Sequence, residues 1–92
     1  MIKSWRHKGL QQFFETGSVA KIQPAHAERL RKQLFALNNA FGPDDMNVRS
    51  WRLHKLRGNL AGHWSIDVNG NWRLTFMFEG TNAVLVDYQD TH

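Results

Sequence analysis

The sequence predicts an α+β fold formed by a single domain over residues 1–92, with two N-terminal helices packed on one face of a twisted, mainly antiparallel sheet. Two observations lead to this prediction. In the first half of the chain, apolar residues recur every three or four positions, as they do in amphipathic helices. In the second half, apolar and polar residues alternate between short turns that contain glycine, which is typical of an antiparallel meander.

The first half begins with a short stretch, residues 1–5, that suggests a strand. A first helix is expected within residues 7–17, with Gly17 available to end it. Pro24 suits the first turn of a second helix, because proline fits where no helical N–H bond is needed. The apolar stripe of this second helix consists of Ala27, Leu30, Leu34, Leu37 and Phe41.

The second half predicts strands over residues 49–56, 63–68, 71–79 and 83–89. A two-residue turn between the second and third of these strands would set apolar side chains opposite polar ones. A three-residue loop, 69–71, instead pairs Val68 with Trp72 and Ile66 with Leu74, which puts both apolar sets on one face. We therefore predict the three-residue loop.

The other face of this sheet should be mostly polar, since it carries Ser65, Asp67, Arg73, Thr75 and Met77. Arg73 should lie across from Asp67. Because both helices are needed to cover the apolar face, we expect the polar face to be free of helices and open to solvent. The four tryptophans are expected in the core.

Positive charge is concentrated in residues 49–73, where five bases face the single acid Asp67. This balance equals the net charge of the whole chain, +4. Such a concentration is the footprint of a surface that binds a polyanion such as RNA. The bases expected to contact RNA phosphates are Arg49, Arg52, Lys55 and Arg57.

Several classes of site are missing from the sequence. The chain has no cysteine, which excludes a disulfide scaffold and a cysteine-rich zinc site. It has no glycine-rich phosphate loop, serine nucleophile elbow or metal-binding histidine pair, so neither a cofactor nor a metal is expected. No apolar run is long enough to span a bilayer, and we expect a cytoplasmic protein without a membrane partner.

The residues left for chemistry are His54, Arg57, Arg73, Asp90 and His92. Histidine can move a proton near neutral pH, whereas arginine keeps its charge and grips phosphate. Together these groups suit attack of a ribose 2′-hydroxyl on the adjacent phosphodiester, which requires a base, an acid and a cation. Each residue also has a purely structural explanation, and His26 and His63 receive no functional role at this stage.

The order "LHKLRGNLAGHWSIDVNGNWRLTFMF" followed by "VDYQDTH" resembles the HigB-type toxins of the RelE/ParE toxin superfamily. The resemblance spans almost the whole chain. It implies a RelE-like microbial ribonuclease fold and the toxin of a type II toxin–antitoxin system. Such a toxin is a ribosome-dependent mRNA endonuclease, which cleaves mRNA in the A site of the small ribosomal subunit, beside the ribosomal RNA, by 2′-hydroxyl attack. It inhibits translation and arrests growth until a HigA-type helix-turn-helix antitoxin neutralises it, and it meets operator DNA only through that antitoxin.

The resemblance also implies the catalytic residues, which are His54, Arg73, Asp90 and His92. Arg57 stands where the family commonly has a lysine. Thr91 occupies a position that is often tyrosine in the family, and threonine can neither stack on a base nor contribute a phenol. We expect His54 and His92 to carry protons and Asp90 to orient them or share that work, although the sequence does not assign base and acid among the three.

Two other functions compete with this prediction. A ParE-like toxin would share the fold but inhibit DNA gyrase by binding, without any cleavage. Such a binder has no need for His54, Arg73 and His92 together. A stand-alone RNA-binding module would expose aromatic side chains rather than bury them.

Overall fold

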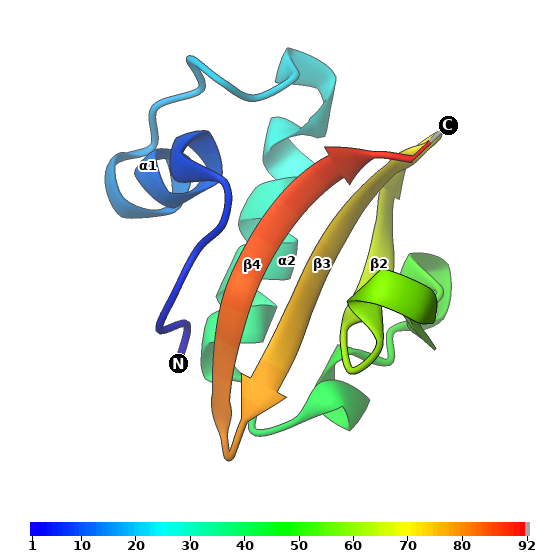
Figure 1. Cartoon of the computed structure of the whole chain (residues 1–92). Helices are drawn as coiled ribbons and strands as arrows, with labels where there is room; N and C mark the ends of the chain where they lie inside the picture. Colours follow the sequence, from blue (N-terminus) through cyan, green and yellow to red (C-terminus); the bar gives the residue numbers. More distant parts are fainter. Residues whose placement is uncertain (92) are drawn as a thin grey trace.

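The computed structural model describes residues 1–91 and contains two α-helices and a four-stranded antiparallel sheet. The helices are α1, Lys8–Thr16, and α2, Ala27–Asn39. The strands are β1, His54–Lys55; β2, Trp64–Asn69; β3, Trp72–Glu79; and β4, Asn82–Asp90, in the spatial order β1-β2-β3-β4. Figure 1 shows α2 running behind the sheet and α1 beside β4. The predicted α+β class is confirmed.

Both helices begin and end where their residue types favour it. The imidazole Nδ1 of His7 accepts the N–H of Leu10 at 2.9 Å and caps the start of α1. Gly17 ends α1 in the left-handed conformation, with φ +82°, and donates its N–H to the carbonyl of Phe13. A short 3₁₀ turn, Pro24–His26, leads into α2. Both predicted helices are therefore confirmed.

The predicted position of Phe41 on the apolar stripe of α2 is wrong. The helix ends at Asn39, and Phe41 is 75% exposed. Asp45 accepts the N–H of Phe41 at 2.8 Å, so the chain turns away from the helix axis before Pro43. The fully buried core is made by Leu10, Leu30, Leu34, Leu37, Met46, Ile66, Leu74, Phe76, Ala83 and Val86. All four tryptophans pack against this core from partly buried positions, as expected.

The N-terminal stretch lies along the outer edge of β4. It forms two isolated parallel bridges, Ile2 with Ala83 and Trp5 with Val86, rather than a continuous strand. The N–H groups of Lys3 and Arg6 donate to β4 carbonyls at 2.8 Å. Covering this edge occupies backbone groups that would otherwise be open to pairing with another chain.

The strand predicted over residues 49–56 is wrong over most of its length. Arg49–Trp51 forms a 3₁₀ turn, and only His54–Lys55 pairs with β2. The physical reason lies at Arg52, whose φ of +52° reverses the local backbone direction and is incompatible with an extended strand.

The pairing of β2 with β3 confirms most of the predicted register. Ile66 opposes Leu74 and Asp67 opposes Arg73. The predicted pair of Val68 with Trp72 is wrong, because Asn69 pairs with Trp72 and the register shifts between Asp67 and Asn69. Val68 is thus the extra residue of a β-bulge.

The bulge makes room for a tight turn. The predicted three-residue loop, 69–71, is wrong, because Gly70, with φ +57°, and Asn71 connect the strands as a two-residue turn. Positive φ at the first central residue matches the twist that short hairpins need. One extra residue in β2 therefore reconciles this tight turn with the apolar alternation of both strands.

The polar face of the sheet has no α-helix over it, but the expectation that it is open to solvent is wrong at its centre. Ser65 and Thr75 are only 1% and 2% exposed. The segment 56–63, which includes a 3₁₀ turn at Gly58–Leu60, lies over this side of the sheet (Figure 1). Gly62 approaches Met77 so closely that a Cβ atom there would lie 3.2 Å from the methionine methyl group.

Neither helix in the described part of the chain has the length and apolar character that crossing a membrane would require.

Two glycines provide a matched test of the end of α1. Replacing Gly17 by alanine should lower the free energy of unfolding by about 1 kcal/mol, because alanine pays a steric cost at φ +82°. Gly42→Ala should change it by less than about 0.5 kcal/mol, since Gly42 has an extended φ of −176°. At both sites the place of the new Cβ has no described atom within 4 Å. Urea unfolding followed by circular dichroism measures both values, and equal values would contradict the capping role of Gly17.

Candidate active site

Arg73, near the start of β3, is held by three acceptors. Its Nε lies 3.1 Å from Oδ1 of Asp67. Its Nη1 donates to the carbonyl oxygen of Gly70 at 2.7 Å and to that of Trp72 at 3.0 Å. The side chain is 23% exposed, so the guanidinium is fixed but still reachable from solvent. The predicted cross-strand pair of Arg73 with Asp67 is confirmed.

Asp67 also faces a second arginine. Nε of Arg52 lies 3.7 Å from Oδ2 of Asp67. The side chain of Arg52 is 80% exposed, so this longer contact is largely screened by water. The left-handed backbone of Arg52 brings its side chain back toward β2, which the sequence did not predict.

His54 joins this group through the backbone of Arg52. Nδ1 of His54 lies 2.9 Å from the carbonyl oxygen of Arg52. Since a carbonyl oxygen only accepts, Nδ1 must carry the proton, and Nε2 of the neutral ring then holds a free lone pair. His54 opposes Ser65, so it shares the polar face with Asp67 and Arg73. In its neutral form, the exposed ring would therefore have the tautomer that a general base requires.

The remaining predicted bases form no hydrogen bond or ion pair with His54, Asp67 or Arg73 in the described part of the chain. Lys55 lies on the other side of β1, with Nζ 5.3 Å from the centre of the Trp64 ring. Arg57 is exposed just before the Gly58–Leu60 turn, and Arg49 is exposed in the turn that precedes Arg52. Arg49, Lys55 and Arg57 therefore do not form a single stripe with His54 and Arg73, and we call these three exposed bases the basic rim.

The end of β4 lies beside the start of β3, which carries Arg73. Asp90 is exposed and opposes Trp72, whereas Gln89 opposes Arg73. Arg73 and Asp90 thus occupy neighbouring positions at one end of the sheet, on alternate sides of the pleat. Thr91 donates from both its N–H and its hydroxyl to the carbonyl of Asn71, each at 2.9 Å, which ties the chain end to the β2–β3 turn. The predicted catalytic His92 lies outside the described residues.

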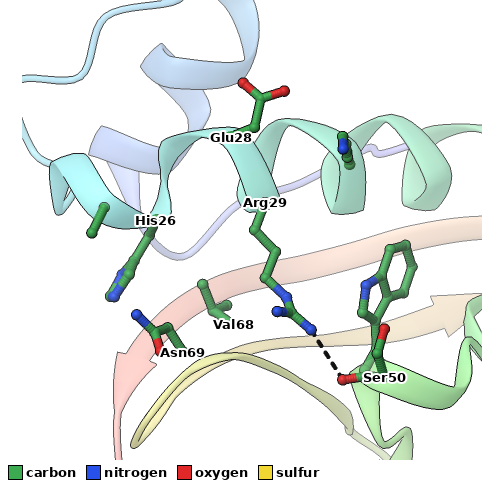
Figure 2. A pocket seen from close by; sticks show the side chains of 9 residues that line it. His26, Glu28, Arg29, Ser50, Val68 and Asn69 are labelled. Atoms are coloured by element: carbon green, nitrogen blue, oxygen red, sulfur yellow. Dashed lines mark hydrogen bonds between the residues drawn. The ribbon is translucent and has the colours of Figure 1, made fainter.

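A groove of about 530 Å³ opens elsewhere, between α2 and the 3₁₀ turn at Arg49–Trp51 (Figure 2). Arg29 reaches across it and donates to the carbonyl of Ser50 at 3.0 Å. None of the predicted catalytic residues in the described part of the chain lines this groove.

His26, at one end of this groove, belongs to a buried pair that sequence reasoning missed. Its Nδ1 lies 2.6 Å from the hydroxyl of Tyr88, and the ring of Trp72 stacks against Tyr88 with centres 4.5 Å apart. Burial lowers the pKa of His26 from its ordinary value of 6.5 and raises the pKa of Tyr88. No local pattern could have paired residues 62 positions apart.

Asp67 is the other residue whose importance was missed, although a signal for it existed. It is the single acid within the basic segment 49–73, and the structure places it between two of that segment's arginines, Arg52 and Arg73. Within residues 1–91, no group of three or more histidine, cysteine, aspartate or glutamate side chains is placed to hold a metal ion.

Comparison with known proteins identifies the family. The model of HigB-like toxins, described as RelE-like toxins of the type II toxin–antitoxin system HigB, matches residues 3–92. The chain belongs to this family. It is 38% identical over 92 residues to the Endoribonuclease HigB of Proteus vulgaris, with both chains covered completely. It is 32% identical over 94 positions to the Toxin HigB-1 of Vibrio cholerae, covering all of this chain and 98% of that protein.

Membership in the HigB-like family implies an antitoxin as partner. These comparisons give no support to the ParE-like alternative. The resemblance seen in the sequence is thus confirmed at the level of the family, whereas the roles of individual residues stay predictions.

The buried His26 should make stability depend on pH. Because its pKa is lowered in the folded chain, the unfolded chain binds an additional proton as the pH falls below about 6.5. The free energy of unfolding should therefore decrease on acidification through this range. His26→Gln, which cannot be protonated, should show a smaller decrease between pH 8 and pH 5.5 in urea titrations. The same pH dependence in both proteins would contradict this account.

Proposed function

We propose that this HigB-like toxin is an endoribonuclease that cleaves mRNA in the ribosomal A site and thereby inhibits translation and arrests growth. The observation that carries the proposal is the placement of His54 and Arg73 on one polar face, linked through Asp67 and Arg52. The full-length similarity to a relative named an endoribonuclease supports the same activity here.

The chemistry follows from what each group can do. The 2′-hydroxyl of one nucleotide loses its proton to a base and attacks the adjacent phosphorus. Arg73 stabilises the negative charge that develops on the phosphate oxygens, and an acid protonates the departing 5′-oxygen. The products are a 2′,3′-cyclic phosphate and a free 5′-hydroxyl. Nε2 of His54 has the lone pair that the base needs. His92 is the second proposed proton carrier, with Asp90 orienting it or sharing its work.

The partners follow from the charge distribution and from the family. Arg49, Arg52, Lys55 and Arg57 are exposed in or next to the segment that carries His54, and we expect them to contact phosphates of mRNA and ribosomal RNA. Because ribosomes are its target, the toxin would act in the cytoplasm. A HigA-type helix-turn-helix antitoxin would neutralise it and would provide its only link to operator DNA.

The roles of the terminal histidine and of Arg73 can be tested by substitution. His92→Ala and Arg73→Ala should each slow cleavage of ribosome-bound mRNA by about 10²–10⁴-fold, since each removes a group that acts on the reacting phosphodiester. Growth arrest should be relieved in parallel. The measurement is cleavage of a defined mRNA on programmed ribosomes, with circular dichroism melts to confirm folding.

Arg31→Ala is the control for these variants. Arg31 lies on α2, where it pairs with Glu28 at 2.9 Å, and its loss should leave cleavage unchanged. Full cleavage by folded His92→Ala would leave His54 and Asp90 as the proton carriers. Growth arrest by a wild-type protein that cleaves no RNA would contradict the endoribonuclease and favour inhibition of gyrase.

The basic rim predicts a strong effect of salt. The logarithm of the ribosome-binding constant should fall linearly with the logarithm of the salt concentration. The reason is that each phosphate that the toxin neutralises releases counterions. Arg49→Ala and Arg57→Ala should each reduce the slope by roughly 0.7, the value for one contact with single-stranded RNA, and Arg31→Ala should not. Ribosome sedimentation between low and physiological salt measures the slope, and an affinity independent of salt would rule out the phosphate contacts.

A further inference from the structure

The carboxylate of Asp67 takes no part in the chemistry above, yet it contacts two arginines of the proposed site, Arg52 and Arg73. Its backbone is also held. The carbonyl oxygen of Asp67 accepts a hydrogen bond of 2.7 Å from Nε2 of Gln33, on α2. Asp67 is therefore fixed from the core side by a helix and meets the arginines on the polar side.

Gln33 is an unusual choice for this place in the core. It is 0% exposed and lies on the buried face of α2 together with Leu30, Leu34 and Leu37. Its Oε1 is buried without a hydrogen-bond partner among the described residues. An unsatisfied buried acceptor destabilises a fold, and an apolar side chain of similar size would avoid this cost. The bond to Asp67 is the interaction that a leucine or methionine could not make.

The hydrogen bond from Gln33 to the Asp67 carbonyl lies next to the bulge in β2. Asp67 directly precedes the bulged Val68, where the pairing of β2 with β3 shifts. A bulge interrupts the ladder and leaves the strand locally less constrained. The amide of Gln33 adds a fixed contact at this interruption, so the direction of the Asp67 side chain is set by α2 as well as by the sheet.

The effect of this fixed carboxylate can be seen in the hydrogen-bond partners of the three guanidinium nitrogens of Arg73. Nε is engaged by Asp67, and Nη1 by the carbonyls of Gly70 and Trp72. For Nη2, no hydrogen bond is found within residues 1–91. We propose that Gln33 and Asp67 are positioning residues that hold Arg73 so that Nη2 is the nitrogen presented to the phosphate. This proposal rests on the proposed function of the toxin.

The same carboxylate would also set the spacing between the cation and the base. Its Oδ2 faces Arg52, whose carbonyl holds His54. Because Arg52 is mostly exposed, the contact of Asp67 with Arg52 is weaker than its contact with Arg73. The main effect of removing the carboxylate is thus expected at Arg73.

The test compares three variants of the full chain. Asp67→Asn removes the charge but keeps the size, and Gln33→Met removes the bond to the Asp67 carbonyl but fills the core. Glu28→Gln is the matched control, since it removes one negative charge at an exposed ion pair on the helix side. Any general electrostatic effect on RNA binding should appear equally in Asp67→Asn and Glu28→Gln.

Two measurements are made on each protein. In ¹⁵N NMR spectra of the arginine side chains, the Nε–Hε signal of Arg73 should shift and exchange faster with water in Asp67→Asn, and move in the same direction in Gln33→Met. On programmed ribosomes, kcat for mRNA cleavage should fall by about 10- to 100-fold in Asp67→Asn, as expected for a misplaced group, without a rise in KM. Glu28→Gln should match the wild type in both.

An unchanged Arg73 signal in Asp67→Asn, or a wild-type kcat in that variant, would overturn the proposal. A rise in KM at constant kcat would also overturn it, because it would make Asp67 a contributor to RNA binding only. If the folded wild type cleaved no RNA, the proposed function would fail and the phosphate role of Nη2 with it. The NMR comparison would then still show whether Asp67 holds Arg73.

Discussion

The contacts of the proposed site depend on the register between β2 and β3. In this register Ile66 opposes Leu74 on the side of the helices, and by strict alternation Asp67 and Arg73 meet on the other side. A slip of one residue would turn the ion pair toward the core and the apolar side chains toward solvent, and burying charges without partners is costly. The bulge at Val68 lets a tight turn at Gly70 coexist with this register. The register of β2 with β3 thus determines both the shape of the turn and the pairing of Asp67 with Arg73.

Helix α2 organises a site that lies on the far side of the sheet. Gln33 reaches the backbone of Asp67, and Arg29 reaches the carbonyl of Ser50 in the turn that precedes Arg52. Both bonds run from the helix to segments that carry side chains of the proposed site. Helix α2 therefore packs against the core and also holds two segments of the proposed site, at Asp67 and at Ser50.

The charge distribution combines one anchored acid with several exposed bases. Asp67 offsets the repulsion between Arg52 and Arg73. Because Asp67 and Arg73 are both largely buried, water screens their ion pair less than it screens a pair on the surface. Arg49 and Arg57 remain exposed in the same basic segment, and exposed positive charge attracts a polyanion. A single acid in this place can hold two arginines in position while the surface keeps its net positive charge. Such a surface suits an RNA substrate, and one relative is named an endoribonuclease.

The sequence by itself determined the fold class, the two helices and the pairing of Ile66 with Leu74, because these depend on local periodicity and on the apolar face of each strand. It also placed Asp67 across from Arg73, which follows from the same alternation. The tertiary structure decided the bulge at Val68, the left-handed turn at Arg52, the cover over Ser65 and the bond from Gln33. These features arise from contacts between segments far apart in the chain, where the choice between a turn, a bulge and a strand depends on what packs against it. Periodicity depends on neighbours along the chain, so it predicted most of the pairs between β2 and β3 but not the contacts made by segments far apart in sequence.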